Sequence, residues 1–87
     1  MAATIMIREA QCETKEALLE RMGRVLGFPE YYGKNLDALY DCLTEMSEPA
    51  RIIYERSSQE SNDDYETVIN VIRDAADNND MISLEII

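Results

Sequence analysis

The sequence of 87 residues contains no histidine and no tryptophan, and only two cysteines. Without histidine, and without a C-x-x-C spacing between Cys12 and Cys42, a zinc site is not expected. The chain also lacks a glycine-rich phosphate loop. We therefore expect no metal and no other cofactor. A disulfide between the two cysteines stays open, but free thiols are the simpler expectation for a cytoplasmic protein.

No apolar run approaches the roughly 20 residues that a membrane-spanning helix needs. The first ten residues, MAATIMIREA, have neither the basic region nor the cleavage site of a signal peptide. The expectation is a cytoplasmic protein with no membrane partner.

Basic residues are scarce: 8 Lys and Arg stand against 18 Asp and Glu, which gives a formal net charge of −10. The imbalance lies in residues 37–87, because acids and bases cancel in residues 1–36. Such a chain repels phosphates, so a nucleic-acid partner is not expected, whereas a basic protein is. The alternative is an acidic surface that only keeps the protein soluble.

Apolar periodicity predicts an α/β protein with the element order β-α-α-β-α-β. The strands are short, nearly continuous apolar runs, and the first is expected to be buried on both faces. Thr14 and Asn35 are candidate N-caps, and Gly27 is a stop signal. The expected strands are 3–7, 50–54 and 81–87, and the expected helices are 15–26, 36–46 and 65–76. These elements predict one domain spanning residues 1–87, a monomer when free, with a three-stranded parallel sheet and helices packed around it.

Two features precede the second helix. Gly23 costs its helix about 1 kcal/mol relative to alanine, which indicates a close approach to a neighbour. Pro29 and Gly33 then define the turn PEYYGKN, which brings Tyr31 and Tyr32 to the next helix. One of these tyrosines is expected in the core and the other on the surface; the sequence leaves open which.

The second helix places Asp37, Asp41 and Thr44 on the side opposite its apolar stripe, with Tyr40 at the border. Asp37 lies near the positive end of the helix dipole, which stabilises its charge. Asp41 lies mid-helix, where its negative charge is repelled by that of Asp37 four residues earlier. A solvated polar face is one interpretation. Rigid aromatics beside carboxylates favour the other, a protein interface that meets a cationic cleft.

The stretch PEYYGKNLDALYDCLTEM, residues 29–46, resembles the signature segment of the barstar family, the intracellular inhibitors of barnase-type ribonucleases. The rest of the chain is similar in length and element order. The resemblance implies a protein inhibitor of a small, basic, microbial-type ribonuclease, or an immunity protein against a ribonuclease toxin. It also implies a mechanism without catalysis, in which the second helix and the turn before it block the active site and imitate RNA phosphates.

The resemblance further implies roles for single residues. Asp41 takes the place of a substrate phosphate, Asp37 pairs with a basic residue at the rim of the ribonuclease site, and Tyr31 stacks on the catalytic histidine of the enzyme. Glu45 and Met46 depart from the best-known member, which has glycine and tryptophan there, so the edge of the contact surface is altered. The expected partner-binding residues are Tyr31, Asn35, Asp37, Tyr40, Asp41, Thr44, Glu45, Met46 and Asp74.

Two alternatives remain. Because Glu45 and Met46 differ, the chain could be a barstar-like interaction domain that binds a basic protein other than a ribonuclease. An enzyme using Asp37 and Asp41 as an acid/base pair, or as Mg²⁺ ligands, lacks a histidine and an identifiable third ligand, and is not expected.

Overall fold

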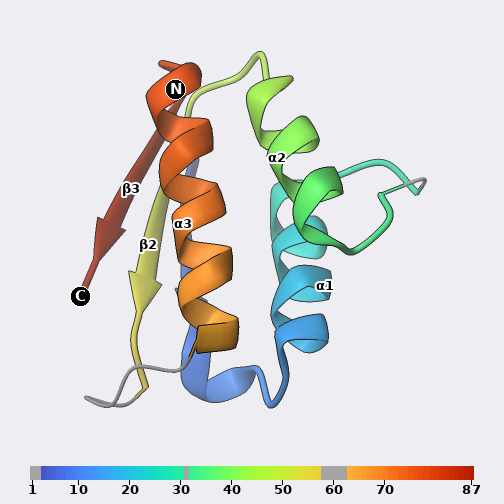
Figure 1. The fold of residues 1–87 in the computed structure, drawn as a ribbon. Helices are drawn as coiled ribbons and strands as arrows, with labels where there is room; N and C mark the ends of the chain where they lie inside the picture. Colours follow the sequence, from blue (N-terminus) through green and yellow to red (C-terminus); the bar gives the residue numbers. More distant parts are fainter. Residues whose placement is uncertain (1–2, 31, 58–62) are drawn as a thin grey trace.

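The computed structural model describes residues 3–30, 32–57 and 63–87 (Figure 1). A short 3₁₀ turn, Glu9–Gln11, follows the first strand. The order of the other elements is β-α-α-β-α-β, which confirms the predicted α/β fold class. These elements are β1 (Ala3–Arg8), α1 (Lys15–Leu26), α2 (Leu36–Thr44), β2 (Ala50–Glu55), α3 (Asp63–Asn78) and β3 (Ile82–Ile86).

The three strands form one parallel sheet in the order β1-β2-β3. Parallel crossovers are right-handed in nearly all proteins. Two such crossovers that advance in the same direction therefore place their helices on the same face of the sheet. Figure 1 shows this arrangement, with α1, α2 and α3 on one side of the strands. The molecule has two layers, one of strands and one of helices.

Because the helices cover only one face of the sheet, the prediction that the first strand is buried on both faces is wrong. β1 is not buried on both faces: Thr4 and Met6 are exposed, and Ile7 is the only residue of the strand that is fully buried. The physical reason is that β1 is an edge strand and its second face has no helix above it. The uncovered face is polar in part, with ion pairs between Arg8 and Glu55 (3.8 Å) and between Arg51 and Glu85 (2.6 Å).

The core fills the space between the sheet and the helices. β2 is the central strand, and alternate residues Ala50, Ile52 and Tyr54 point into the core. Each helix buries one apolar stripe against this layer, as its periodicity predicts. The stripes include Leu18 and Met22 of α1, Leu39 and Leu43 of α2, and Val68, Ile69, Ile72 and Ala75 of α3.

The predicted helix ends are confirmed for α1. The hydroxyl of Thr14 accepts a hydrogen bond from the Ala17 N–H at 3.0 Å, as an N-cap does. Gly27 ends the helix in the left-handed conformation with φ 70°, which favours glycine. In the ranges that the structure describes, no helix has both the length and the apolar composition to cross a membrane.

Candidate protein-binding site

The turn before α2 is anchored by Tyr32, which is 7% exposed. Its hydroxyl donates a hydrogen bond to the Leu19 carbonyl at 3.0 Å, and its ring meets Phe28 edge to face at a centroid distance of 5.0 Å. Burial raises the pKa of Tyr32 to about 12. Tyr32 is therefore the core tyrosine of the pair. Tyr31, the residue expected to contact a partner, lies outside the described residues.

Gly23 is the place where this ring approaches α1. A Cβ atom on Gly23 would lie 2.6 Å from Cδ2 and 2.7 Å from Cε2 of Tyr32. Real carbon atoms do not come so close, so only glycine leaves room for the ring. The close approach predicted from the sequence is confirmed, and it links the position of the turn to the surface of α1.

The start of α2 is fixed by its cap. The side-chain oxygen of Asn35 accepts a hydrogen bond from the Ala38 N–H at 2.8 Å, so Asn35 is the predicted N-cap. The residue before it, Lys34, has φ 54°, a left-handed conformation that is uncommon outside glycine. The direction in which α2 leaves the turn therefore depends on Lys34 and Asn35 together.

The outer face of α2 carries Asp37 and Asp41, and the C-cap Glu45 continues the row; we call these three carboxylates the acidic strip. All three side chains are exposed. They are spaced four residues apart, or about 6 Å along the helix axis per step. Within residues 3–30, 32–57 and 63–87, the ion pairs found join Arg8–Glu55, Arg24–Glu20, Arg51–Glu85 and Arg56–Glu66. The acidic strip takes part in none of these ion pairs, so no lysine or arginine of the described residues neutralises it.

Thr44 and Tyr40 form the border between the acidic strip and α3, and both are half-buried. The Thr44 hydroxyl lies 2.9 Å from the Tyr40 carbonyl and 3.1 Å from the Asp41 carbonyl, and donates within its own helix. Its oxygen can still accept a hydrogen bond from outside. The expected water-facing hydroxyl is therefore turned partly inward.

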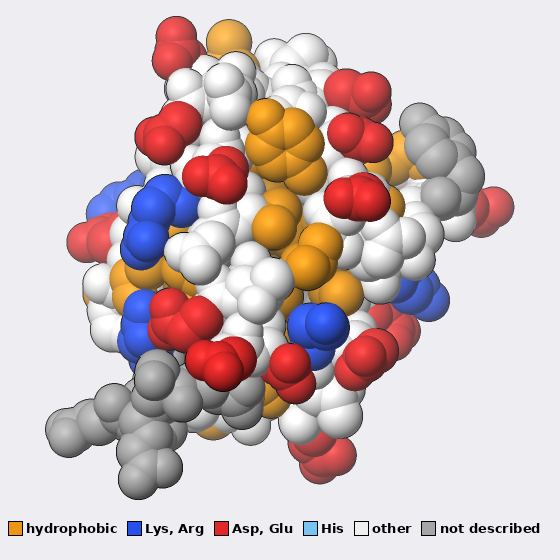
Figure 2. Space-filling model, in the orientation of Figure 1, with side chains coloured by type: hydrophobic (Ala, Val, Ile, Leu, Met, Phe, Trp, Pro, Cys, Tyr) orange, Lys and Arg blue, Asp and Glu red, His pale blue; other side chains and the backbone are white. Residues whose placement is uncertain are grey.

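Tyr40 connects α2 to α3. Its hydroxyl accepts a hydrogen bond from the Asn78 side-chain amide at 3.0 Å, and the same amide contacts the Asp74 carbonyl at 3.0 Å. Asp74 itself is exposed, one helical turn before Asn78. Figure 2 shows acidic side chains over both α2 and α3, with an apolar group between them. The structure thus brings Asp74 to the same side of the molecule as Tyr40.

The end of α2 is held by Asn79, which follows directly after α3. Its side-chain amide lies 2.9 Å from the Leu43 carbonyl, 3.4 Å from that of Thr44 and 3.0 Å from that of Met46. The Leu43 carbonyl also accepts a hydrogen bond from the Met46 N–H at 3.3 Å, so the Asn79 amide adds to a turn that already closes the helix. The helix ends at Thr44 with Glu45 as its C-cap, and not at the predicted residue 46. An asparagine just after α3 was the available signal, but its target lies 33 to 36 residues away.

Both cysteines are free, as expected. Cys12 is buried and Cys42 is half-buried beside the acidic strip. The pKa of the Cys42 thiol is raised by burial, then by the charges of Glu45 and Asp41.

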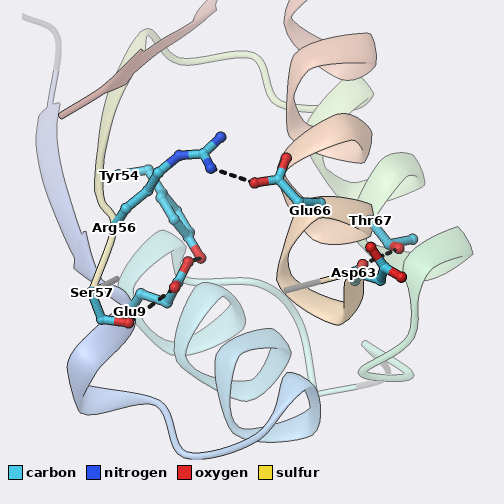
Figure 3. A network of polar contacts seen from close by, with 7 residues as sticks. All are labelled: Glu9, Tyr54, Arg56, Ser57, Asp63, Glu66 and Thr67. Carbon is cyan, nitrogen blue, oxygen red and sulfur yellow. Dashed lines mark hydrogen bonds and ion pairs between the residues drawn. The ribbon is translucent and has the colours of Figure 1, made fainter. Parts of the chain in front are cut away.

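A second polar cluster, also missed in the sequence, lies where β1 and β2 end (Figure 3). The carboxylate of Glu9 is buried and accepts hydrogen bonds from the hydroxyls of Tyr54 and Ser57, the latter at 3.0 Å. Burial and the Glu9 carboxylate raise the pKa of Tyr54. The cluster ties together the segments that follow two neighbouring strands, so its role is structural. Across the described ranges, no group of three or more acidic, cysteine or histidine side chains is placed to hold a metal ion.

Comparison with known proteins agrees with this geometry. The family described as Barstar (barnase inhibitor) matches residues 2–86 of the chain. A protein of Bacillus subtilis (strain 168), named "Putative ribonuclease inhibitor YrdF", is 50% identical over 40 residues, which is 46% of this chain. The match spans 44% of that protein's own length, less than half. The family match covers nearly the whole chain, and the chain therefore belongs to the barstar family.

Proposed function

We propose that the chain is a non-catalytic inhibitor of a small basic ribonuclease of microbial type. The acidic strip and the turn before α2 enter the active site. There Asp41 takes the place of an RNA phosphate, and Asp37 pairs with a basic residue of the enzyme at the rim of the site. Tyr31, Asn35, Tyr40, Thr44, Met46 and Asp74 surround these contacts. Family membership and the name of the relative support the class of function. The observation that carries the mechanism is that Asp37 and Asp41 are exposed and have no ion pair among the described residues.

The physical basis is electrostatic. A ribonuclease site concentrates positive charge to hold phosphates, and a protein with net charge −10 is steered toward it. Once docked, guanidinium and ammonium groups donate charge-assisted hydrogen bonds to the carboxylates and slow release.

The scaffold lowers the cost of docking. Asn35 fixes the start of α2, Asn79 its end, and the Tyr40–Asn78 hydrogen bond joins it to α3. The carboxylates are thus held in place before the partner arrives, and less conformational entropy is lost on binding. We expect the inhibitor to act as a monomer in the cytoplasm, either as a housekeeping inhibitor or as immunity against a ribonuclease toxin.

The test is inhibition of RNA cleavage by a panel of small basic ribonucleases that includes barnase. We expect stoichiometric inhibition of at least one, weakened by salt. Asp41→Ala should raise its inhibition constant at least about 100-fold, because two charge-assisted hydrogen bonds contribute about 1.5–3 kcal/mol each. Glu13→Ala is the matched control: it removes the same charge from an exposed residue before α1.

Equal inhibition by the Asp41→Ala and Glu13→Ala variants would show that Asp41 is not central. If the wild type inhibits no ribonuclease but binds a basic protein without ribonuclease activity, the chain is instead an interaction domain with another target. The exposed Glu45 at the edge of the surface is the feature that favours this second possibility.

A further inference from the structure

A pocket of about 230 Å³ lies on the side of α2 that faces the end of α1. We call it the side pocket. Leu26, Phe28 and Pro29 form one wall, and Cys42 and Met46 form the other, with Glu45 beside them. Pockets that bind small molecules usually measure about 300–1,000 Å³. The side pocket is smaller than these, and its size suits a single side chain.

About half of the side pocket's lining is apolar, the rest is polar and includes Ser47, and its charge is negative. Among the described residues that line it, Glu45 is the one ionised group. Glu45 is exposed and takes part in no ion pair found in the described parts of the chain. Burial raises the pKa of the Cys42 thiol, and the nearby charges of Glu45 and Asp41 raise this pKa further. A pocket of mixed polar and apolar lining with a carboxylate at its edge suits a side chain that has an apolar stem and a cationic head.

Among such side chains, arginine fits best. Its guanidinium is planar and weakly hydrated, so it tolerates apolar walls, and it stacks on aromatic rings such as that of Phe28. It also donates two parallel hydrogen bonds to one carboxylate, whereas lysine presents a compact and strongly hydrated charge.

We propose that the side pocket receives an arginine of the inhibited ribonuclease, whose guanidinium pairs with Glu45. This inference rests on the proposed function and makes it more specific. Asp37 and Asp41 serve any cationic ribonuclease site, whereas the side pocket, built in part from Glu45 and Met46, selects ribonucleases that carry an arginine beside that site.

The first experiment measures affinity for whichever ribonuclease of the panel is inhibited. Glu45→Gln keeps the shape of the side chain and removes its charge, and should weaken binding about tenfold, the loss of one charge-assisted pair. Glu48→Gln is the matched control, because Glu48 is exposed, carries the same charge and does not line the pocket. It should change affinity less than twofold. Each exposed arginine of the ribonuclease is then replaced by alanine, and its affinity is measured for the wild type and for the Glu45→Gln variant. One arginine should weaken binding to the wild type but not weaken binding to the Glu45→Gln variant any further.

The second experiment uses Cys42 as a reporter. Iodoacetamide alkylation of Cys42 should slow at least tenfold when the ribonuclease is bound, while the buried Cys12 reacts slowly in both states. The inference is overturned if Asp41→Ala abolishes inhibition but Glu45→Gln matches Glu48→Gln and Cys42 reacts equally fast in the complex. Coupling to a lysine alone would refute arginine as the occupant. If the wild type inhibits no ribonuclease, the proposed function fails and this inference fails with it.

Discussion

Replacement of Gly23 by alanine tests how the turn before α2 is held. Alanine in an exposed helix position normally stabilises a protein by about 1 kcal/mol relative to glycine. Here the new methyl group would lie 2.6 Å from the Tyr32 ring, about 1 Å inside the contact distance of about 3.5–4 Å for two carbon atoms. The ring must move, because the nearest atoms belong to its rigid edge.

The magnitude follows from what the ring loses. Displacement weakens the hydrogen bond from the Tyr32 hydroxyl to the Leu19 carbonyl, a bond that contributes about 0.5–1.5 kcal/mol. It also weakens the edge-to-face contact with Phe28, about 0.5–1.5 kcal/mol, and overpacking itself costs about 1–3 kcal/mol. After the gain in helix propensity is subtracted, we expect Gly23→Ala to lower the free energy of unfolding by about 2 kcal/mol.

Urea denaturation followed by circular dichroism measures this change. With a slope near 1 kcal/mol per molar for a small protein, the midpoint should fall by about 2 M. The control repeats the substitution in a Tyr32→Leu background, where no ring opposes the methyl group and alanine should be neutral or stabilising. The reasoning is refuted if Gly23→Ala raises the midpoint in the wild-type background, or if its effect is the same in both backgrounds.

Two further predictions concern the cap of α2 and the response to alkali. Asn79→Ala should lower the free energy of unfolding by about 2 kcal/mol, because it removes part-buried hydrogen bonds to the Leu43 and Met46 carbonyls that contribute about 0.5–1.5 kcal/mol each. Asn78→Ala removes an exposed amide and should cost less, and equal urea midpoints for the two variants would contradict this. The pKa of Tyr32 is raised from 10.0 to about 12, so its contribution to stability is complete below pH 10 and is lost as the pH rises toward 12. Tyr32→Phe should remove part of the fall in stability between pH 10 and pH 12, which is measured as the thermal midpoint at each pH. If the thermal midpoint falls as steeply with pH in this variant as in the wild type, Tyr32 is not buried as described.

The local features of the fold were predictable because their signals lie within a few residues of their effects. Thr14 and Asn35 cap the amide of a residue three positions further on, and Gly27 adopts the left-handed conformation at its own position. The helices followed from apolar periodicity, and the parallel sheet followed from the type of connection between strands. The outward direction of Asp37 and Asp41 needed only the helical repeat.

What the sequence could not supply depends on residues that are distant along the chain. Strand order decides which face of the sheet is covered, and the composition of β1 does not encode it. The Asn79 amide and the Glu9 carboxylate have partners more than 30 residues away, so no local pattern reveals their contacts. For the tyrosine pair, the structure places Tyr32 in the core, whereas the partner-binding roles remain predictions.

The uncovered face of the sheet offers a place to attach the molecule to a support. Ser83 is exposed on this face, in register with Arg51, while α2 lies in the opposite layer. A linker or fluorescent dye coupled there would leave α2 free to face the solution. Under the proposed function, a sensor for ribonucleases follows from this attachment without redesigning any residue of the helical layer.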